Sequence, residues 1–406
     1  MNSITRSIKA KAALVDPSRY GRSDRSQLGR WFWEIDKVLL LLVAILIGIG
    51  LIAVAAASPA AGHRYSGGSV QFSDLHYFYR QLMWIAVGVP VMIAVSMLPR
   101  DRARRLSLAG AAFFFVLLIF VPILGPEVNG AVRWIDIGIG QLQPSEFLKP
   151  FYVVAMAWLL SLKEKDKGLP VFAMSALLTG GIAFLLMQQP DFGSTVIFAA
   201  VWIAMLALAG MSMRLLIAMA VAGVAGIVLA YFFYDVATAR IDGFLFGEGD
   251  TFQTDSAMRT LTAGGLFGMG PGGGTRKFSL PEPHTDYIFS VIGEEFGLIA
   301  CFAIALLYLF IVARVLIKLL DEESSFAILA AAGLAIQFGL QAMINMAVNV
   351  QIAPSKGMTL PFISYGGSSM LALSIGMGLL LAFTRRNPYL TRSPYVVKWN
   401  GESLQA

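Results

Sequence analysis

Long apolar runs alternate with short polar segments along most of this chain. Ten of the runs have about the 20 residues that a helix needs to cross roughly 30 Å of hydrocarbon. They lie at 37–57, 78–98, 106–124, 146–162, 170–187, 194–209, 215–234, 295–317, 326–350 and 367–383. The pattern therefore predicts an all-α polytopic membrane protein with about ten transmembrane helices.

One polar segment is much longer than the others. Residues 235–286, between spans seven and eight, far exceed the usual connection of about 2–8 residues between helices. We expect this loop to carry short amphipathic or interfacial helices. Six of its apolar residues are predicted to dip into the membrane interface or to cover a cavity: Phe244, Phe246, Met258, Leu261, Leu266 and Phe267.

The two ends of the chain are polar and predict tails outside the membrane. The first 30 residues mix charges and are poor in apolar side chains, which is typical of a flexible segment. They contain no apolar stretch like that of a signal peptide, so we expect the first span to act as its own insertion signal. The predicted division is an N-terminal tail at 1–36, a membrane domain at 37–384 and a C-terminal tail at 385–406.

Composition agrees with a membrane protein and excludes a chain of two or three soluble domains. Hydrophobic residues make up 57% of the sequence and charged residues only 14%. The single cysteine, Cys301, lies inside an apolar run, which excludes a disulfide framework and a cysteine-based metal site.

The formal net charge of +6 is a topology signal and does not indicate a nucleic-acid partner. If ten spans alternate across the membrane, both termini lie on one side, and 22 of the 31 Lys and Arg residues fall there. By the positive-inside rule that side is cytoplasmic. The long loop 235–286 is then extracytoplasmic.

Polar and ionisable residues gather in five places at span ends on the predicted outer side. An ionisable side chain in the middle of a membrane helix costs about 2.5–3.5 kcal/mol on insertion scales, so such residues invite a functional interpretation. The five segments are 129–134, 143–150, 188–194, 280–286 and 345–368. Because all five lie on the same face, they could converge on one cavity.

Two pairs in these segments each allow two interpretations. Glu146 and Lys149 share a helix face, so they either neutralise each other, with Lys149 snorkelling outward, or aim a cation into a cavity for an anionic ligand. Arg133 and Trp134 are either a surface cation and an interfacial aromatic residue, or two ligand contacts. In the second case Arg133 binds phosphate and Trp134 stacks on a sugar.

The glycine-rich stretch 264–277 is also ambiguous. It lacks the Gly-Lys-Ser/Thr ending of a P-loop, so nucleotide binding is unlikely, and it is either a flexible segment or a backbone cradle for pyrophosphate. Asp286 could cap the next helix. Of the following glutamates only Glu294, and not Glu295, falls near the helix face of Asp286. The three histidines are too scattered to predict a metal site.

Five motifs in order resemble a known family. They read Asn-Gly-Ala-Val-Arg-Trp-Ile at 129–135, Gln-Pro-Ser-Glu-Phe-Leu-Lys at 143–149, Gln-Pro-Asp-Phe-Gly-Ser at 189–194, Leu-Pro-Glu-Pro-His-Thr-Asp-Tyr-Ile-Phe at 280–289 and Lys-Gly-Met-Thr-Leu-Pro-Phe-Ile-Ser-Tyr-Gly-Gly-Ser-Ser at 356–369. From about residue 37 to residue 390 the chain is similar to the shape, elongation, division and sporulation (SEDS) family of bacterial membrane proteins. The last motif looks more like the division members than the elongation members.

The resemblance implies a peptidoglycan glycosyltransferase that polymerises lipid II into glycan strands at the outer face of the cytoplasmic membrane, for septal wall synthesis. Its implied partners are lipid II, the growing glycan strand, a class B penicillin-binding protein (an FtsI-like transpeptidase) and other division proteins. The family's essential aspartate falls on Asp286, the predicted catalytic residue. The predicted substrate-binding residues are Arg133, Trp134, Glu146, Lys149, Gln189, Asp191, His284, Lys356, Ser364, Tyr365 and Ser368.

The implied chemistry is an inverting displacement at a sugar that already carries a good leaving group. It needs a base, and a carboxylate such as that of Asp286 contributes typically 10²- to 10⁴-fold. It also needs cations near the departing pyrophosphate, for which Arg133, Lys149 and Lys356 are candidates. No cofactor is required, although a divalent cation such as Mg²⁺ or Mn²⁺ could assist.

Two other functions fit parts of the same pattern. A lipid II flippase or other transporter would also have ten spans with polar residues and Gly or Pro breaks, but carriers usually place their site near the membrane midplane. A scaffold that only recruits the penicillin-binding protein would need no catalytic carboxylate. The grouping of the motifs at one face favours the enzyme.

Overall fold

The bundle consists of long helices in the order that the apolar runs predict. The structure is a computed structural model, and it describes residues 27–67, 71–127, 131–136, 138, 140–246, 252–354 and 357–385. The long helices are α3 (Lys37–Tyr65), α4 (His76–Ser96), α5 (Arg100–Leu124), α6 (Pro144–Lys165), α7 (Val171–Gln188), α8 (Phe192–Leu208), α9 (Met213–Phe233), α12 (Ile288–Leu319), α13 (Ser325–Asn349) and α14 (Gly367–Thr384).

The helix count agrees with the prediction. Within the described residues, nine helices are long and apolar enough to cross a membrane, and α8 is a shorter apolar helix of 17 residues. Each of the ten predicted spans overlaps one of these ten helices. The prediction of an all-α polytopic membrane protein with about ten membrane helices is therefore confirmed.

The remaining elements are short. They are α2 (Gln27–Glu34), β1 (Ile135–Asp136), β2 (Gln141–Leu142), α10 (Asp235–Leu245), α11 (Phe252–Ala263) and the 3₁₀ helix η2 (Arg276–Phe278). Strands β1 and β2 pair antiparallel, with Ile135 opposite Leu142. Because α10, α11 and η2 lie in the long loop, short helices form there as expected. Because α2 is helical, the prediction of a flexible segment up to residue 30 is wrong for its last residues.

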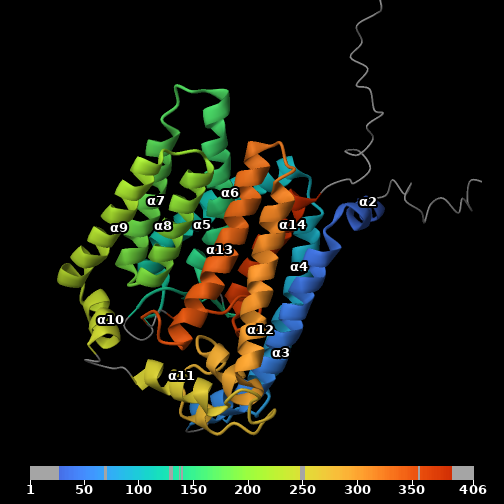
Figure 1. Cartoon of the computed structure of the whole chain (residues 1–406), viewed down its shortest axis with the longest axis vertical. Helices are drawn as coiled ribbons and strands as arrows, with labels where there is room; N and C mark the ends of the chain where they lie inside the picture. Colours follow the sequence, from blue (N-terminus) through green and yellow to red (C-terminus); the bar gives the residue numbers. More distant parts are fainter. Residues whose placement is uncertain are drawn as a thin grey trace, which may run out of the picture.

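The two ends of the bundle differ in content. The motif end, which is the lower end in Figure 1, is where α3, α5 and α13 finish and where α6, α12 and α14 begin. The terminal end, opposite, is where α3 begins and α14 finishes. Helices α6, α13 and α14 form the centre, because 78%, 67% and 67% of the residues in their most apolar 18-residue stretches are buried. In α9, at the left edge of Figure 1, only 6% of the corresponding stretch is buried.

Charged residues fasten the terminal end. Asp36 caps α3 by accepting hydrogen bonds from two backbone N–H groups of its first turn. The same carboxylate lies 3.0 Å from Arg314 and 3.2 Å from Lys318, both on α12. Glu34 at the end of α2 pairs with Arg385 directly after α14 at 3.3 Å. The Asp36 pairs thus hold the start of α3 to α12, and the Glu34–Arg385 pair holds α2 to the end of α14.

The segment 357–366 does not stay at the outer face, where the sequence predicted a polar loop. Gly50 lies about 22 Å before the end of α3 at 1.5 Å per residue, and a Cβ added to it would lie 2.4 Å from the carbonyl oxygen of Phe362. Tyr308, far inside α12, donates a hydrogen bond to the carbonyl of Pro361 at 2.5 Å. We call 357–366 the re-entrant segment. Irregular backbone at this depth requires protein around it, and Phe362 is buried.

Helix α12 begins seven residues earlier than the predicted span, at Ile288. Its first part ends at Gly297, whose φ of 84° and ψ of 171° are not helical, so the helix kinks there. Ser290, Glu294 and Glu295 interrupt the apolar pattern in this first part, so the apolar runs did not predict it.

Candidate functional site

Asp286 lies on the turn before α12 and is half-buried. Its backbone carbonyl accepts hydrogen bonds from the side-chain amides of Asn345 at 2.9 Å and Asn349 at 3.1 Å, both on α13. A Cβ added to Gly357 would lie 3.4 Å from Asp286 Oδ2, so the carboxylate faces the re-entrant segment. The N-cap residue of α12 is Tyr287, whose own side chain makes no capping hydrogen bond, so Asp286 precedes the cap by one residue and its capping role stays a prediction.

The re-entrant segment is hydrogen-bonded to the turn that carries Asp286. Tyr365 N–H donates to the carbonyl of His284 at 2.8 Å, and Ser364 Oγ donates to the carbonyl of Thr285 at 2.6 Å. The ring of His284 lies 5.3 Å from that of Tyr365 and 4.1 Å from that of Tyr77 on α4, centroid to centroid. The structure thus brings together four of the predicted site residues, Asp286, His284, Ser364 and Tyr365.

His284 is neutral at physiological pH. Burial lowers the pKa of its imidazole to about 4, and the nearby Glu282 carboxylate only partly opposes this shift. Its Nδ1 has no hydrogen-bond partner among the described residues. A buried neutral imidazole among tyrosine rings supports the turn but brings no positive charge to an anionic ligand.

Arg133, Gln189 and Asp191 form a second group, where α5, α7 and α8 meet. Arg133 donates from Nε to the carbonyl of Gln189 at 3.2 Å and also donates to the carbonyl of Pro190. Gln189 donates to the carbonyl of Leu118 on α5 at 2.8 Å. Asp191 caps α8 by accepting from the backbone N–H of its third residue. Gln189 and Asp191 are buried in these structural bonds, whereas Arg133 and Trp134 are half-buried.

Trp84 on α4 links this second group to the re-entrant segment. A Cβ added to Gly140, in the turn between β1 and β2, would lie 3.8 Å from the indole ring. A Cβ added to Gly367, the first residue of α14, would lie 2.5 Å from the same ring. The hairpin that follows Arg133 and Trp134 therefore lies beside the start of α14, where Ser368 is half-buried.

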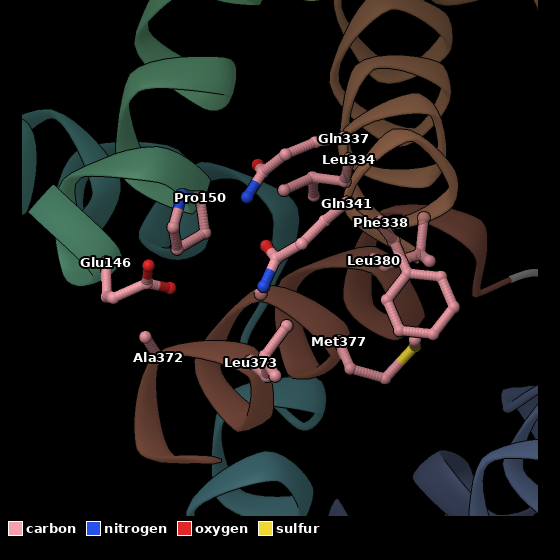
Figure 2. A pocket seen from close by; sticks show the side chains of 11 residues that line it. Glu146, Pro150, Leu334, Gln337, Phe338, Gln341, Ala372, Leu373, Met377 and Leu380 are labelled. Carbon is pink, nitrogen blue, oxygen red and sulfur yellow. The ribbon is translucent and has the colours of Figure 1, made fainter. Parts of the chain in front are cut away.

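Glu146 and Lys149 form an ion pair at 2.6 Å inside the bundle. The Lys149 side chain is only 2% exposed, so it does not snorkel outward. Glu146 lines a cavity between α6, α13 and α14 (Figure 2), which offers about 20 Å³ to the centres of water-sized molecules. This cavity is far too small for a disaccharide. Lys149 contacts Glu146 inside the bundle and does not line this cavity.

A larger cavity lies elsewhere and is apolar. It offers about 360 Å³, lies between α5, α6 and α7, and is lined by side chains such as Phe115, Trp158 and Leu178. Its lining contains no charged residue, so it has the chemistry for a hydrocarbon chain and not for a sugar or a phosphate.

The glycine-rich stretch is bound to α12 and is neither free nor open to pyrophosphate. Glu294 accepts hydrogen bonds from the backbone N–H groups of Arg276 at 2.6 Å and Lys277 at 3.0 Å. Glu295 accepts from the backbone N–H of Gly272 and from the Lys277 ammonium. Three backbone donors that could have held phosphate, those of Gly272, Arg276 and Lys277, are therefore bonded to carboxylates. Both carboxylate oxygens of Glu294, the glutamate that helix geometry allows near Asp286, are thus bonded to the glycine-rich stretch.

The glycines of this stretch permit close backbone contact with the kink of α12. A Cβ added to Gly268 would lie 2.2 Å from the carbonyl oxygen of Glu295, and one added to Gly297 would lie 2.2 Å from that of Leu266. Gly268 also has a φ of 83°, which favours glycine. Gly264 and Gly268 are therefore required for this packing, whereas Gly265, Gly270 and Gly272 have open space around an added Cβ.

The remaining predictions concern the apolar residues of the long loop, the third cation and a metal site. Of the six apolar loop residues, Leu261 is buried against α12, Met258 is partly buried, and Phe246 and Phe267 are the most exposed. Lys356, the third predicted cation, lies outside the described residues. Within the described residues, no group of three His, Cys, Asp or Glu side chains is arranged to hold a metal ion.

Sequence reasoning missed a polar stripe on α13. Gln337, Gln341, Asn345 and Asn349 follow one another at four-residue spacing and are all buried. This spacing places them on one face of the helix. The signal was present, because amides recur every fourth residue in an otherwise apolar run. The stripe leads from the middle of the bundle to the carbonyl of Asp286.

Comparison with known proteins gives matches over the whole bundle. A family model for FtsW, RodA and SpoVE, described as a cell cycle protein, matches residues 37–389. The probable peptidoglycan glycosyltransferase FtsW of Caulobacter vibrioides is 40% identical over 376 residues, which are 91% of this chain and 94% of the relative. The protein of the same name from Coxiella burnetii is 33% identical over 87% of this chain and 98% of its own length.

Solved structures share the fold. A chain of a peptidoglycan synthase complex, studied for the structural coordination of polymerization and crosslinking, matches with a TM-score of 0.71 at 26% identity, over 86% of this chain and 97% of its own. The crystal structure of the rod shape determining protein RodA of Thermus thermophilus matches with a TM-score of 0.63 at 26% identity, over 86% of this chain and 96% of its own. The similarity thus includes the helices that carry both groups of site residues.

Proposed function

We propose a mechanism from the premise that this chain belongs to the FtsW, RodA and SpoVE family of cell cycle proteins and is a peptidoglycan glycosyltransferase of cell division. In this proposal Asp286 is the base of the reaction. The observation that carries it is the way the turn is held, with its backbone fixed by Asn345 and Asn349 and its carboxylate directed at Gly357.

The reaction is a displacement at the anomeric carbon of a sugar linked to polyprenyl pyrophosphate. The acceptor hydroxyl oxygen forms the new glycosidic bond while the bond to the pyrophosphate oxygen breaks. Asp286 takes the hydroxyl proton, and undecaprenyl pyrophosphate leaves with the bonding electrons. A single displacement inverts the configuration at the anomeric carbon and needs one base. A fixed carboxylate in hydrogen-bond reach of the hydroxyl supplies it.

Positive charge near the leaving group comes from Arg133 and Lys356 in this proposal. Arg133 is half-buried and donates to backbone carbonyl groups, and no carboxylate among the described residues forms an ion pair with it. Lys149 is neutralised by Glu146, so its contribution is to position α6. A divalent cation such as Mg²⁺ or Mn²⁺ would be held by the pyrophosphate oxygens and by Asp286. The other carboxylate of this turn, that of Glu282, accepts hydrogen bonds from Tyr65 and Thr285.

The partner in this proposal is a class B penicillin-binding protein that crosslinks the new strands, in a complex with other division proteins at the septum. The similar chain from a peptidoglycan synthase complex supports this pairing. Helix α12 offers an exposed apolar ridge for a single membrane helix of that partner, including Phe302, Leu309 and Phe310. The proposed placement has both termini in the cytoplasm and the motif end facing the outer side of the cytoplasmic membrane.

The test is polymerisation of labelled lipid II by the purified chain with its penicillin-binding partner. We expect long glycan strands from the wild type and none from Asp286→Asn. The matched control is Asp74→Asn, which makes the same chemical change at an exposed residue before α4. Equal polymer from wild type and Asp286→Asn would remove Asp286 from the mechanism. No polymer from either, together with transfer of lipid II across liposome membranes, would instead support a flippase.

A further inference from the structure

The cavity between α6, α13 and α14 has the size and the lining of a water site. Its volume of about 20 Å³ for the centres of water-sized molecules exceeds the roughly 10–15 Å³ that one water needs. Three polar side chains line it, those of Glu146, Gln337 and Gln341, among apolar neighbours (Figure 2). A buried water commonly has two to four polar partners. The cavity therefore has space and partners for one or two waters.

Two of these side chains have unmet hydrogen-bonding capacity. Gln341 donates from Nε2 to the carbonyl of Thr359 at 3.2 Å, which fixes the orientation of its amide and turns Oε1 away from Thr359. Gln341 Oε1 and Gln337 Oε1 are buried, and no donor among the described residues reaches them. A buried acceptor without a donor is destabilising, so both oxygens need a donor.

The charges around the cavity decide which ligand can supply that donor. The carboxylate of Glu146 is neutralised by the Lys149 ammonium at 2.6 Å, so a second cation beside it would be repelled by Lys149. An anion would be repelled by Glu146 and offers no donor. Water donates two hydrogen bonds and accepts two, which suits two amide oxygens and a carboxylate that is already paired.

We infer that this cavity is a binding site for one or two ordered water molecules that donate to Gln337 and Gln341. The waters complete a polar connection from the Glu146–Lys149 pair on α6, through Gln341, to Thr359 of the re-entrant segment. Thr359 in turn exchanges a hydrogen bond of 2.8 Å with Ser369 on α14. The site thereby ties α6 to the segment that faces Asp286. Its effect on catalysis, though not its occupancy, rests on the proposed function.

The direct test is a cryo-electron microscopy map of the full chain with its penicillin-binding partner, at a resolution that shows ordered water. We expect density at about 2.5–3.0 Å from Gln341 Oε1 and within the same range of Gln337 Oε1 or a carboxylate oxygen of Glu146. A cavity without density, or one closed by rotated side chains, would overturn the inference. So would density with the short, multiple oxygen contacts of a metal ion.

Substitution at Gln337 tests the same site in solution, because this side chain makes no hydrogen bond to the described chain. Gln337→Met keeps the length and removes the polar atoms, whereas Gln337→Asn keeps an amide and leaves room for a further water. We expect Gln337→Met to lower the unfolding temperature by several degrees and the polymerisation rate about tenfold, with the KM for lipid II unchanged and with both losses largely restored in Gln337→Asn.

A higher or unchanged unfolding temperature in Gln337→Met would mean that the cavity is dry, because removing an orphaned oxygen would then be neutral or favourable. The map separates this inference from the proposed function. Water density in a chain that polymerises nothing would leave the site intact and remove only its catalytic role.

Discussion

Gly357 is the residue of the re-entrant segment that faces Asp286. Its φ of 60° is in the left-handed region, where an alanine costs roughly 1–2 kcal/mol. A methyl group at this position would touch Asp286 Oδ2, at 3.4 Å, and would cover the side of the carboxylate where we expect an acceptor hydroxyl to approach. We predict that Gly357→Ala lowers lipid II polymerisation by at least tenfold.

Gly210 provides a matched control for that substitution. It also has a positive φ, 74°, but no other side chain or backbone atom lies within 4 Å of an added Cβ. Gly210→Ala should therefore cost similar stability in thermal unfolding and leave polymerisation near the wild-type rate. Equal activity in the two variants would show that the Gly357 side of Asp286 is not the approach route.

His284 makes stability depend on pH in a defined direction. Its pKa of about 4 in the folded chain lies below the ordinary value near 6.5, so the unfolded chain binds a proton first as the pH falls. The stabilising effect is complete above about pH 6.5 and is lost as the pH falls towards 4, by up to about 3 kcal/mol. We predict that His284→Gln flattens this part of the stability profile.

Thermal unfolding between pH 7 and pH 4.5 would measure the effect of His284. His63→Gln is the control, because His63 is exposed at the end of α3. Equal slopes for wild type and His284→Gln would show that His284 is already protonated or exposed. The polymerisation rate above pH 6 should depend on pH in the same way for the wild type and for His284→Gln, because His284 is already neutral there.

Among the elements, the start of α12 depends on a buried ion pair. Lys277 in η2 is 2% exposed and pairs with Glu295, which is 1% exposed, and also donates to the carbonyl of Ala56 on α3 at 2.9 Å. Removing one partner of such a pair leaves an uncompensated charge and costs about 3–5 kcal/mol. We predict that Lys277→Met lowers the unfolding temperature strongly and reduces polymerisation, because the turn with Asp286 lies between η2 and α12.

The double variant Lys277→Met with Glu295→Gln tests whether charge is the cause. Gln at 295 keeps an oxygen for the backbone N–H of Gly272 and removes the unpaired charge, so the double variant should be more stable than Lys277→Met alone. Arg104→Met, which breaks an exposed pair with Asp101, should change stability by less than about 1 kcal/mol. Additive losses in the double variant would contradict the charge explanation.

Apolar periodicity predicted the membrane helices well and their connections poorly. Runs of about 20 apolar residues identify a spanning helix because the bilayer thickness fixes that length. The re-entrant segment has no such length rule, and its depth is set by contacts such as Phe362 against Gly50 that lie far apart in sequence. The same limit applies to Glu294 and Glu295, whose partners come from the glycine-rich stretch.

Within the site, the sequence predicted the residue types better than their grouping. His284, Ser364 and Tyr365 do meet around the turn of Asp286, because two motifs fold against each other. Gln189 and Asp191 have structural partners that motif spacing cannot reveal.

Taken as a whole molecule, the bundle has polar groups buried within its apolar core and a margin that is mostly apolar. The central helices α6, α13 and α14 carry the Glu146–Lys149 pair and the amide stripe, whereas α9 exposes apolar side chains along nearly its whole length. Polar groups thus extend inward from the motif end to Gln337, at the middle of α13. The enzyme assignment therefore rests on the family match and not on the position of the motifs at one face.

The pair between Glu34 and Arg385 places the two ends of the bundle next to each other. The described chain therefore begins and ends at neighbouring points on the terminal end. The α8–α9 turn around Gly210 lies on that same end. A circular permutant could join the two ends of the bundle by a short linker and open the chain at the α8–α9 turn. Every helix would keep its neighbours in this permutant. The order in which the helices are synthesised is therefore separable from the way they pack.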